Sequence, residues 1–179
     1  MTVIKQEDFV ASVADALQFI SYYHPLDFVR AVHGAWEREQ NPAAKDAMAQ
    51  ILINSRMCAE GHRPICQDTG IVTVFLKVGM AVRWEAELSV AAMVNEGVRR
   101  AYTHPDNVLR ASILEDPAGA RTNSGDNTPA VIHMELVPGD TVDVQVAAKG
   151  GGSENKSKLA MLNPSDSIVD WVVKTVPTM

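Results

Sequence analysis

The chain has 179 residues, of which 46% are hydrophobic and 21% charged, proportions that are ordinary for a globular protein with a real core. Its net charge is -6 and it has no basic cluster, so nucleic-acid and anionic-membrane binding have little electrostatic support. Its two cysteines are too few for a disulfide framework, and with no visible signal peptide or bilayer-spanning run they favour a reducing cytoplasm.

The first third of the chain is predicted to be helical. Apolar residues recur at helical spacing from Phe9 to Ile20. A second helix is expected from Pro25, which suits a first helical turn, to Trp36. A third is expected to begin at Pro42 and to end near Gly61.

The pattern then changes from helix to strand. Residues 71–78 are apolar and mostly β-branched, which predicts a largely buried strand. Residues 85–102 are helical again, and residues 116–129 form a loop rich in Gly, Pro, Asn and Asp. Such a loop is typical of a functional segment rather than of a linker.

Two further strands, residues 131–137 and 142–148, are separated by a Pro-Gly-Asp turn, which predicts a hairpin. After a glycine-rich loop we expect a short helix near Lys158, then a last helix that is capped by Ser165 or Asp166 and breaks at Pro177. Helices come first and strands later. This order predicts a mixed α/β (α+β) fold, with helices packed on a small sheet in a single domain.

Residues 63–70 (Arg-Pro-Ile-Cys-Gln-Asp-Thr-Gly) form the first candidate site. The Cys66 thiolate could bind a soft metal, while Gln67 and Asp68 could bind or deprotonate a polar substrate. One cysteine cannot hold zinc or iron tightly, so at least two further ligands would come from elsewhere. The alternative is a buried structural thiol, which is our interpretation of Cys58 in its helical pattern.

Residues 149–156 (Lys-Gly-Gly-Gly-Ser-Glu-Asn-Lys) form the second candidate site. Gly150, Gly151 and Gly152 permit close backbone approach, and successive N–H groups can bind an anion. The segment lacks the Gly-Lys-Ser/Thr ending of a Walker loop, so a carboxylate is as plausible a guest as a phosphate. The alternative is a flexible hairpin tip.

Residues 121–129 (Arg-Thr-Asn-Ser-Gly-Asp-Asn-Thr-Pro) could orient a polar substrate, although the pattern alone favours a hydrogen-bonded loop. Arg110 is a candidate for bidentate carboxylate binding, or equally a solvent-facing helix end. No two histidines stand at a metal-ligand spacing, and His133 is expected to be a packed or cross-strand residue.

These three motifs, in this order, resemble the N-terminal part of the iron–sulfur hydro-lyases, which are the class I fumarate hydratases and the related tartrate dehydratases. The resemblance covers nearly the whole chain. Residues 22–25 (Tyr-Tyr-His-Pro) and 163–166 (Asn-Pro-Ser-Asp) also resemble the single-chain fumarase type. The resemblance implies reversible hydration of fumarate to malate.

The resemblance also implies roles for individual residues. Members of the family hold a [4Fe-4S] cluster by three cysteines and leave one iron open as a Lewis acid. Cys66 matches the first cluster ligand, and Gln67 and Asp68 match substrate contacts, with Asp68 also assisting proton transfer. Residues 150–152 match a binder of the substrate carboxylate, and Arg110 matches a carboxylate-binding arginine.

The chain departs from the family because it lacks the other cluster cysteines and the C-terminal catalytic groups. We therefore expect residues 1–179 to be the N-terminal (alpha) domain of a fumarase that is inactive and without a complete cluster on its own. Its expected partners are a small dicarboxylate, the C-terminal domain of the same enzyme, and a second copy in a homodimer. The alternatives are a tartrate dehydratase domain, a non-catalytic dicarboxylate- or anion-binding module, and a structural half-domain that mediates assembly.

Overall fold

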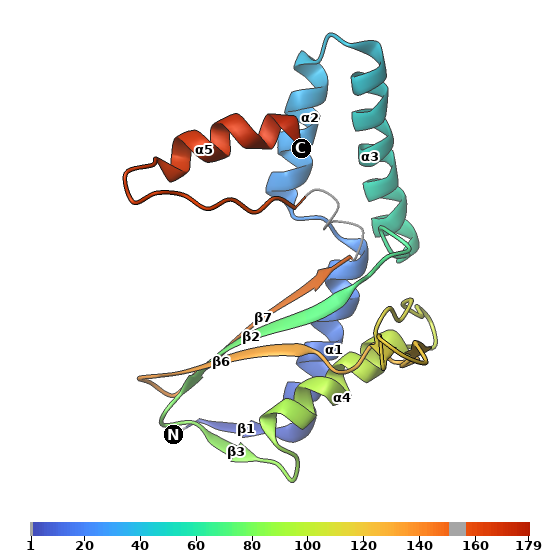
Figure 1. The fold of residues 1–179 in the computed structure, drawn as a ribbon. Helices are drawn as coiled ribbons and strands as arrows, with labels where there is room; N and C mark the ends of the chain where they lie inside the picture. The colour runs from blue at the N-terminus through green and yellow to red at the C-terminus, as the bar shows by residue number, and fades with distance from the viewer. Residues whose placement is uncertain (1, 151–156) are drawn as a thin grey trace.

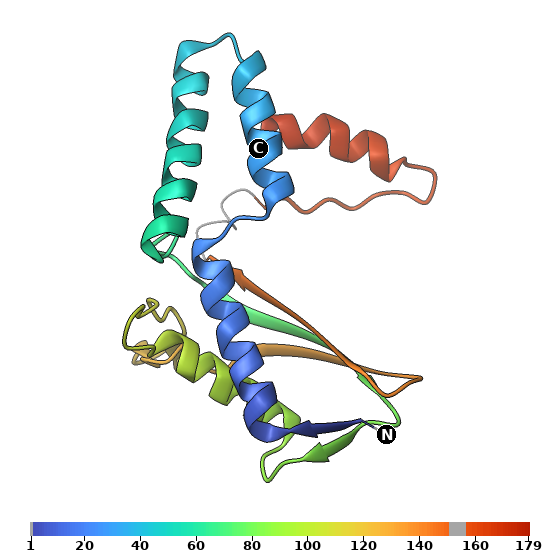
Figure 2. The ribbon, with the colours of Figure 1, turned by 180° about the vertical axis from the view of Figure 1, so that it is seen from behind.

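Two helices cover one face of a three-stranded sheet, and a pair of helices projects from the end of that unit (Figures 1 and 2). The computed structural model describes residues 2–150 and 157–179. The helices are α1 (Gln6–Tyr22), α2 (Leu26–Arg38), α3 (Pro42–Gly61), α4 (Val90–Tyr102), α5 (Ile168–Thr175) and the 3-10 turn η2 (Val176–Thr178). The strands are β1 (Val3–Lys5), β2 (Ile71–Gly79), β3 (Arg83–Glu85), β4 (Leu114–Glu115), β5 (Thr122–Asn123), β6 (Val131–Val137) and β7 (Val142–Lys149).

The central strand of the main sheet is β2, which lies between β6 and β7. It pairs in parallel with β6 and antiparallel with β7. The predicted hairpin between residues 131–137 and 142–148 is therefore wrong, because these strands flank β2 instead of pairing with each other. His133 lies opposite Phe75 and stacks on its ring at 5.0 Å between centroids, which confirms the expected cross-strand role.

The segment between β6 and β7 crosses the end of β2. The backbone N–H of Gly79 donates to the carbonyl of Thr141 at 2.9 Å, and that of Ala81 donates to the carbonyl of Gly139 at 2.9 Å. The carbonyls of Gly139 and Thr141 thus accept from residues at or just after the end of β2, whereas in a hairpin turn they would pair within the turn. Every second side chain of β2 from Val72 to Val78 is buried, so one face of this central strand packs against the core.

The core lies between β2 and the two covering helices. Its fully buried members come from α1, β2, α4 and the segment after α4: Phe9, Val10, Val13, Leu17, Val72, Val74, Leu76, Val78, Met93, Val94, Val98, Ala101, Tyr102 and Leu109. Burial on one face and exposure on the other is the pattern expected for an antiparallel or mixed sheet covered on a single side.

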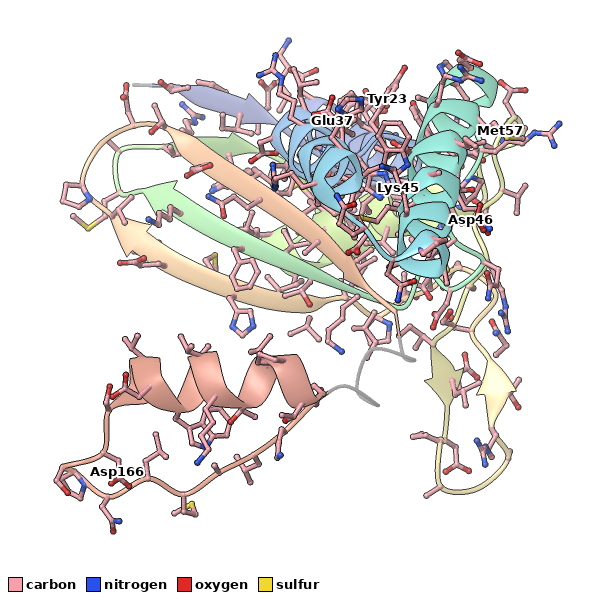
Figure 3. The ribbon with its side chains drawn as sticks, turned by 90° about the horizontal axis from the view of Figure 1, so that it is seen from above. Tyr23, Glu37, Lys45, Asp46, Met57 and Asp166 are labelled. Carbon is pink, nitrogen blue, oxygen red and sulfur yellow. The ribbon has the colours of Figure 1, made fainter. Side chains whose placement is uncertain are left out.

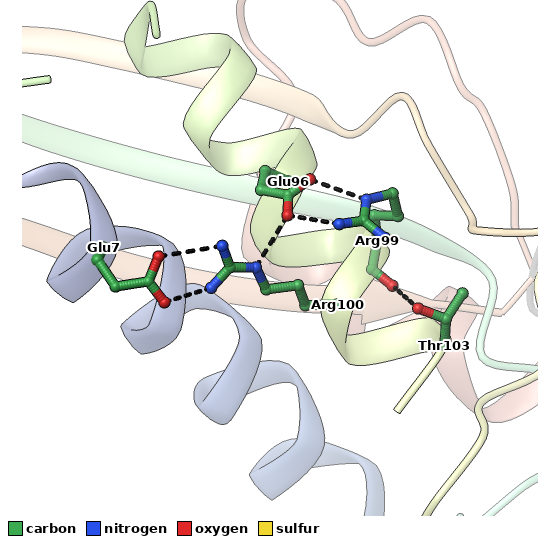
Figure 4. Close-up of polar contacts among 5 residues, drawn as sticks. All are labelled: Glu7, Glu96, Arg99, Arg100 and Thr103. Atoms are coloured by element: carbon green, nitrogen blue, oxygen red, sulfur yellow. Dashed lines mark hydrogen bonds and ion pairs between the residues drawn. The ribbon is translucent and has the colours of Figure 1, made fainter. Parts of the chain in front are cut away.

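An ion-pair network joins the outer faces of α1 and α4 (Figure 4). Arg100 binds both oxygens of Glu7 on α1, and its Nε donates to Glu96 at 2.9 Å. Arg99 also donates to Glu96, at 2.8 Å from its Nε, while Thr103 caps the helix end through the Arg99 carbonyl. Hydrogen bonds from Arg99 and Arg100 lower the pKa of Glu96 to about 2.

The helices α2 and α3 form a projecting antiparallel pair, seen from above in Figure 3. Asn41 caps α3 by accepting from the N–H of Ala43 at 2.9 Å, and Lys45 lies over the Trp36 ring at 5.1 Å. No residue of α2 is fully buried. In Figure 3, α5 lies apart from the labelled side chains of this pair.

The predicted fold class is confirmed as mixed α/β (α+β) in a single domain, with some element boundaries corrected. The helix expected from residue 85 begins at Val90, because Glu85 belongs to β3 and Ser89 caps α4 through the N–H of Ala92. No helix forms near Lys158 in residues 157–163. The last helix is capped by Ser167, which accepts from the N–H of Asp170 at 3.2 Å, and not by Ser165 or Asp166.

Candidate functional site

The first two sequence motifs meet at Gly70. This residue has φ +67, in the left-handed region that glycine tolerates. A Cβ atom on it would lie 1.6 Å from the carbonyl oxygen of Lys149, at the end of β7. The backbones of residues 66–70 and 149–150 therefore touch directly, with no room for a side chain between them.

Asp68 extends this contact to the glycine-rich loop. A Cβ atom on Gly150 would lie 3.2 Å from Asp68 Oδ2 and 3.2 Å from its Cγ. The carboxyl group of Asp68 therefore lies against the backbone of Gly150, where a larger residue would push it away. Two candidate residues from distant parts of the sequence are thus neighbours, while Gly151 and Gly152 lie outside the described residues.

The two cysteines have different surroundings. Cys66 is exposed, and its Sγ makes a long contact of 3.5 Å with the Oε1 of Gln67. Cys58 is only 6% exposed, as expected for a core residue, and its Sγ lies 3.6 Å from the carbonyl oxygen of Pro64. Cys66 is not the buried structural thiol of the alternative interpretation, and it is free to bind a soft metal or to react.

The segment that carries Cys66 is fixed to the helices at its N-terminal end. The N–H of Ile65 donates to the carbonyl of Ser21 at 2.8 Å, and the Asn54 side chain donates to the carbonyl of Ile65 at 3.1 Å. These bonds join the segment to the end of α1 and to α3. Asn54 was not singled out from the sequence, because nothing in a helical asparagine signals so distant a partner.

A cavity of about 570 Å³ opens beside the motif. Its wall includes Cys66, Asp68 and Thr69 together with His24, Tyr102 and the end of β7. Burial lowers the pKa of His24, and its Nδ1 lies 3.1 Å from the Oγ of Ser55. Burial also raises the pKa of the Tyr102 phenol, an effect that its hydrogen bond with Thr69 partly opposes. Neither His24 nor Tyr102 was predicted as a site residue from the sequence.

Arg110 is exposed, and its main chain is tied to the Cys66 motif. The Oγ1 of Thr69 donates to the carbonyl oxygen of Arg110 at 2.6 Å. The expected carboxylate-binding residue thus lies on a segment that is hydrogen-bonded to the motif with Gln67 and Asp68. Thr69 supplies this link, which the sequence analysis did not anticipate.

The third motif, residues 121–129, contacts the Cys66 motif through Asn127. Its side chain is fully buried, and its Nδ2 donates to the carbonyl oxygen of Gly70 at 2.9 Å. Its Oδ1 accepts from the N–H groups of Ser112 at 2.7 Å and of Ile113 at 3.2 Å. The segment is a hydrogen-bonded loop, as favoured from the pattern, but one of its asparagines connects two other segments of the site.

The residues present suit a metal only in part. Within residues 2–150 and 157–179, no group of three or more His, Cys, Asp and Glu side chains could hold a metal ion. Cys66 offers one exposed soft donor at the cavity wall.

None of the helices within residues 2–150 and 157–179 has the length and apolar character that a membrane crossing needs.

Comparison with known proteins identifies the family. Residues 10–179 match the family model described as fumarate hydratase (Fumerase). The chain belongs to this family. It is 32% identical over 172 residues to the putative L(+)-tartrate dehydratase subunit alpha of Methanocaldococcus jannaschii, covering 92% of this chain and 59% of that protein.

Class I fumarate hydratases of Escherichia coli are similar as well. The aerobic protein is 34% identical over 135 residues, covering 73% of this chain and 24% of its own length. The anaerobic protein is 29% identical over 184 residues, covering 100% of this chain and 32% of its own length. This member of the fumarate hydratase family therefore spans between about a quarter and three fifths of the length of these curated relatives.

Proposed function

We propose that this chain is the N-terminal domain of an iron–sulfur fumarate hydratase and takes part in the reversible hydration of fumarate to malate. The observation that supports this most directly is the contact of Asp68 with Gly150, beside the exposed thiol of Cys66. Cys66 and Asp68 lie in the wall of one cavity, and Gly150 lies against Asp68. A soft sulfur donor and a carboxylate are groups that a metal-assisted reaction of a dicarboxylate can use.

In this proposal Cys66 holds one iron of a [4Fe-4S] cluster, and the remaining ligands come from outside the described residues. The thiol fits that role because it is exposed at the cavity wall and its contact with Gln67 is a long one. When bound, the cluster supplies an open iron that acts as a Lewis acid towards the substrate's carboxylate and hydroxyl groups.

The chain's own residues bind the substrate and move its proton. The Gln67 amide and the Arg110 guanidinium donate hydrogen bonds to substrate carboxylates, as amide and guanidinium groups do well. Backbone N–H groups of residues 150–152 bind a carboxylate in the manner of an anion nest. The Asp68 carboxylate takes the proton that leaves the substrate in dehydration and returns it in hydration.

The test is fumarate hydration by the enzyme that contains this chain, with its cluster reconstituted. Cys66→Ala should abolish activity, and Asp68→Asn should lower kcat by about 10²-fold with a smaller effect on KM. Cys58→Ala is the matched control and should retain activity, because Cys58 is buried on α3 and is not part of the cavity wall. Wild-type turnover in Cys66→Ala would overturn the proposal.

We further propose that the 179-residue chain alone is inactive and does not hold the complete cluster. Anaerobic reconstitution with iron and sulfide, followed by visible absorption spectroscopy, tests this. A colourless folded product is expected, both from the wild type and from Cys66→Ala. A stoichiometric brown cluster that needs Cys66 would show that groups such as those of a second copy complete the site.

Tartrate dehydration is the second candidate, because a tartrate dehydratase subunit alpha is among the relatives at 32% identity. The two reactions share their chemistry and differ by one hydroxyl group on the substrate. The kcat/KM values of the assembled enzyme for fumarate, malate and L(+)-tartrate separate them. Saturable fumarate binding by this chain that survives Cys66→Ala, without turnover in any assembly, would favour the anion-binding module instead.

Partners and compartment belong to the same proposal. The C-terminal domain of the enzyme and a second copy in a homodimer are the proposed partners, and a reducing cytoplasm is the proposed compartment. Exposed apolar side chains on α5 support a protein partner: Ile168, Val169, Val172 and Val173. Sedimentation of the assembled enzyme tests the homodimer.

A further inference from the structure

We infer that Asn127 is a positioning residue that fixes the Cys66 motif relative to the segment that carries Arg110. This inference rests on the proposed function, because it assigns these two segments to one site. We call the buried side chain of Asn127, with its bonds to Gly70, Ser112 and Ile113, the Asn127 clasp.

The clasp uses both ends of one amide group. Oδ1 accepts two backbone N–H groups from the segment two and three residues after Arg110, and Nδ2 donates to the carbonyl that ends the Cys66 motif. Backbone N–H groups can only donate and carbonyls can only accept, so these partners fix which end of the amide is which. Asparagine supplies both functions at this length, whereas aspartate supplies only acceptors.

Asn127 is itself held in place. Its φ is 63, in the left-handed region that asparagine tolerates better than most residues, and its N–H donates to the Oγ of Ser124 at 3.1 Å. Asp126 fixes the next turn by accepting from the N–H of Thr128 at 3.0 Å. These two local hydrogen bonds therefore fix the conformation of the loop that carries the Asn127 clasp.

A second hydrogen bond joins the same two segments. Thr69 donates to the carbonyl of Arg110, so two hydrogen-bonded connections join the Cys66 motif to residues 110–113. Displacement of either segment must stretch both connections. Because Asn127 is 0% exposed and does not line the cavity, it acts through the residues it positions and not by touching the substrate.

The variants separate the two arms of the clasp. Asn127→Asp keeps the acceptor for Ser112 and Ile113 and loses the donor to Gly70, whereas Asn127→Ala loses both arms. Asn95→Ala is the matched control, because Asn95 accepts from the N–H of Ala130 at 2.9 Å at the far end of the same loop. Asn127→Ser, uncharged and too short to span both segments, replaces Asn127→Asp should burial of a carboxylate prevent folding.

The first measurement is made on the 179-residue chain with a nitroxide label on the exposed Cys66 in a Cys58→Ala background. The rotational correlation time of the label should fall at least twofold in Asn127→Asp and Asn127→Ala and stay unchanged in Asn95→Ala. Amide hydrogen exchange at Ser112 and Ile113 should accelerate at least tenfold in Asn127→Ala and stay within threefold in Asn127→Asp. Folded Asn127 variants with wild-type label motion and wild-type exchange would overturn the inference.

The second measurement is kinetic and uses the reconstituted enzyme that contains this chain. In folded enzyme, Asn127→Asp should lower kcat/KM for fumarate at least tenfold per bound cluster, while Asn95→Ala remains within twofold. A loss of activity that unfolding alone accounts for would contradict a positioning role. An enzyme in which even the wild type fails to hydrate fumarate would refute the proposed function, while label motion and amide exchange would still decide the inference.

Discussion

The unit formed by β2, α1 and α4 differs from the projecting helices in what covers its apolar side chains. The unit buries its core within itself, from Phe9 on α1 to Leu109 after α4. The projecting pair buries little beyond Ser55 and Cys58, and it exposes large apolar residues along α2 and α3: Leu26, Phe28, Ile51, Ile53 and Met57. Both regions have apolar residues at helical spacing. This spacing is enough to predict a helix, but its apolar face is buried only where another element packs against it.

The largest expected effect contrasts two helical methionines. Met93 on α4 is 0% exposed, and Met57 on α3 is 62% exposed. Met93→Ala should lower the free energy of unfolding by about 3 kcal/mol, because it leaves a cavity in the core. Met57→Ala should change it by less than about 0.5 kcal/mol. Urea unfolding followed by circular dichroism measures both.

Equal losses in the two methionine variants would break the comparison. They would mean that the surface around Met57 is covered in solution, for example by a second copy of the chain. A loss in Met57→Ala that grows with protein concentration would identify that cover as self-association.

A comparable effect is expected at the contact between the sheet unit and the site. Gly70→Ala should lower the free energy of unfolding by about 3 kcal/mol or displace residues 66–70, because its Cβ would overlap the Lys149 carbonyl and its φ is positive. Gly125→Ala is the control: its φ is +80 but nothing lies within 4 Å of its Cβ, so only about 1 kcal/mol is expected. Thermal unfolding of the two variants separates crowding from backbone strain.

Equal costs for the Gly70 and Gly125 variants would show that residues 66–70 do not pack against β7 as described. The motif would then be free to move with the projecting helices, to which Ile65 binds through Asn54 on α3. The contact of Asp68 with Gly150 would lose its structural basis.

The comparison also explains what could be predicted from sequence. Helical spacing in residues 9–20 and β-branched residues in 71–78 gave the correct elements, because such patterns depend on local geometry alone. The central position of β2 could not be predicted, because a Pro-Gly-Asp turn suits a hairpin equally well and the choice depends on how α1 and α4 cover the sheet. Strand order therefore depends on tertiary packing and not on the local sequence.

The site divides in a similar way. Cys66, Gln67 and Asp68 are adjacent in sequence, so their grouping could be predicted, and the resemblance implied that residues 150–152 bind a carboxylate of the same substrate. The role of Asn127 could not, because its donor bond to Gly70 spans 57 residues. A buried asparagine inside a polar loop has the same local pattern as an exposed one, and only the folded chain distinguishes them.

The smallest expected effect concerns two ion-paired glutamates, one in each of the two regions. Glu96 lies between Arg99 and Arg100 on the sheet unit with its side chain 25% exposed, whereas Glu60 pairs with Arg56 on α3 at 3.8 Å with its side chain 71% exposed. Glu96→Gln should cost about 1 kcal/mol at pH 7, since the two arginines are themselves partly solvated, and Glu60→Gln should cost about 0.3 kcal/mol or less.

The pH dependence decides whether the Glu96 network acts in solution. The hydrogen bonds from Arg99 and Arg100 lower the pKa of Glu96 from 4.5 to about 2. Because the folded-state pKa is the lower one, the stabilisation is fully present above pH 4.5 and is lost as the pH falls towards 2. Urea unfolding at pH 7 and pH 3.5 should therefore show that the difference in unfolding free energy between wild type and Glu96→Gln narrows at the lower pH. A gap independent of pH would mean that Glu96 contributes through packing of its side chain and not through its charge.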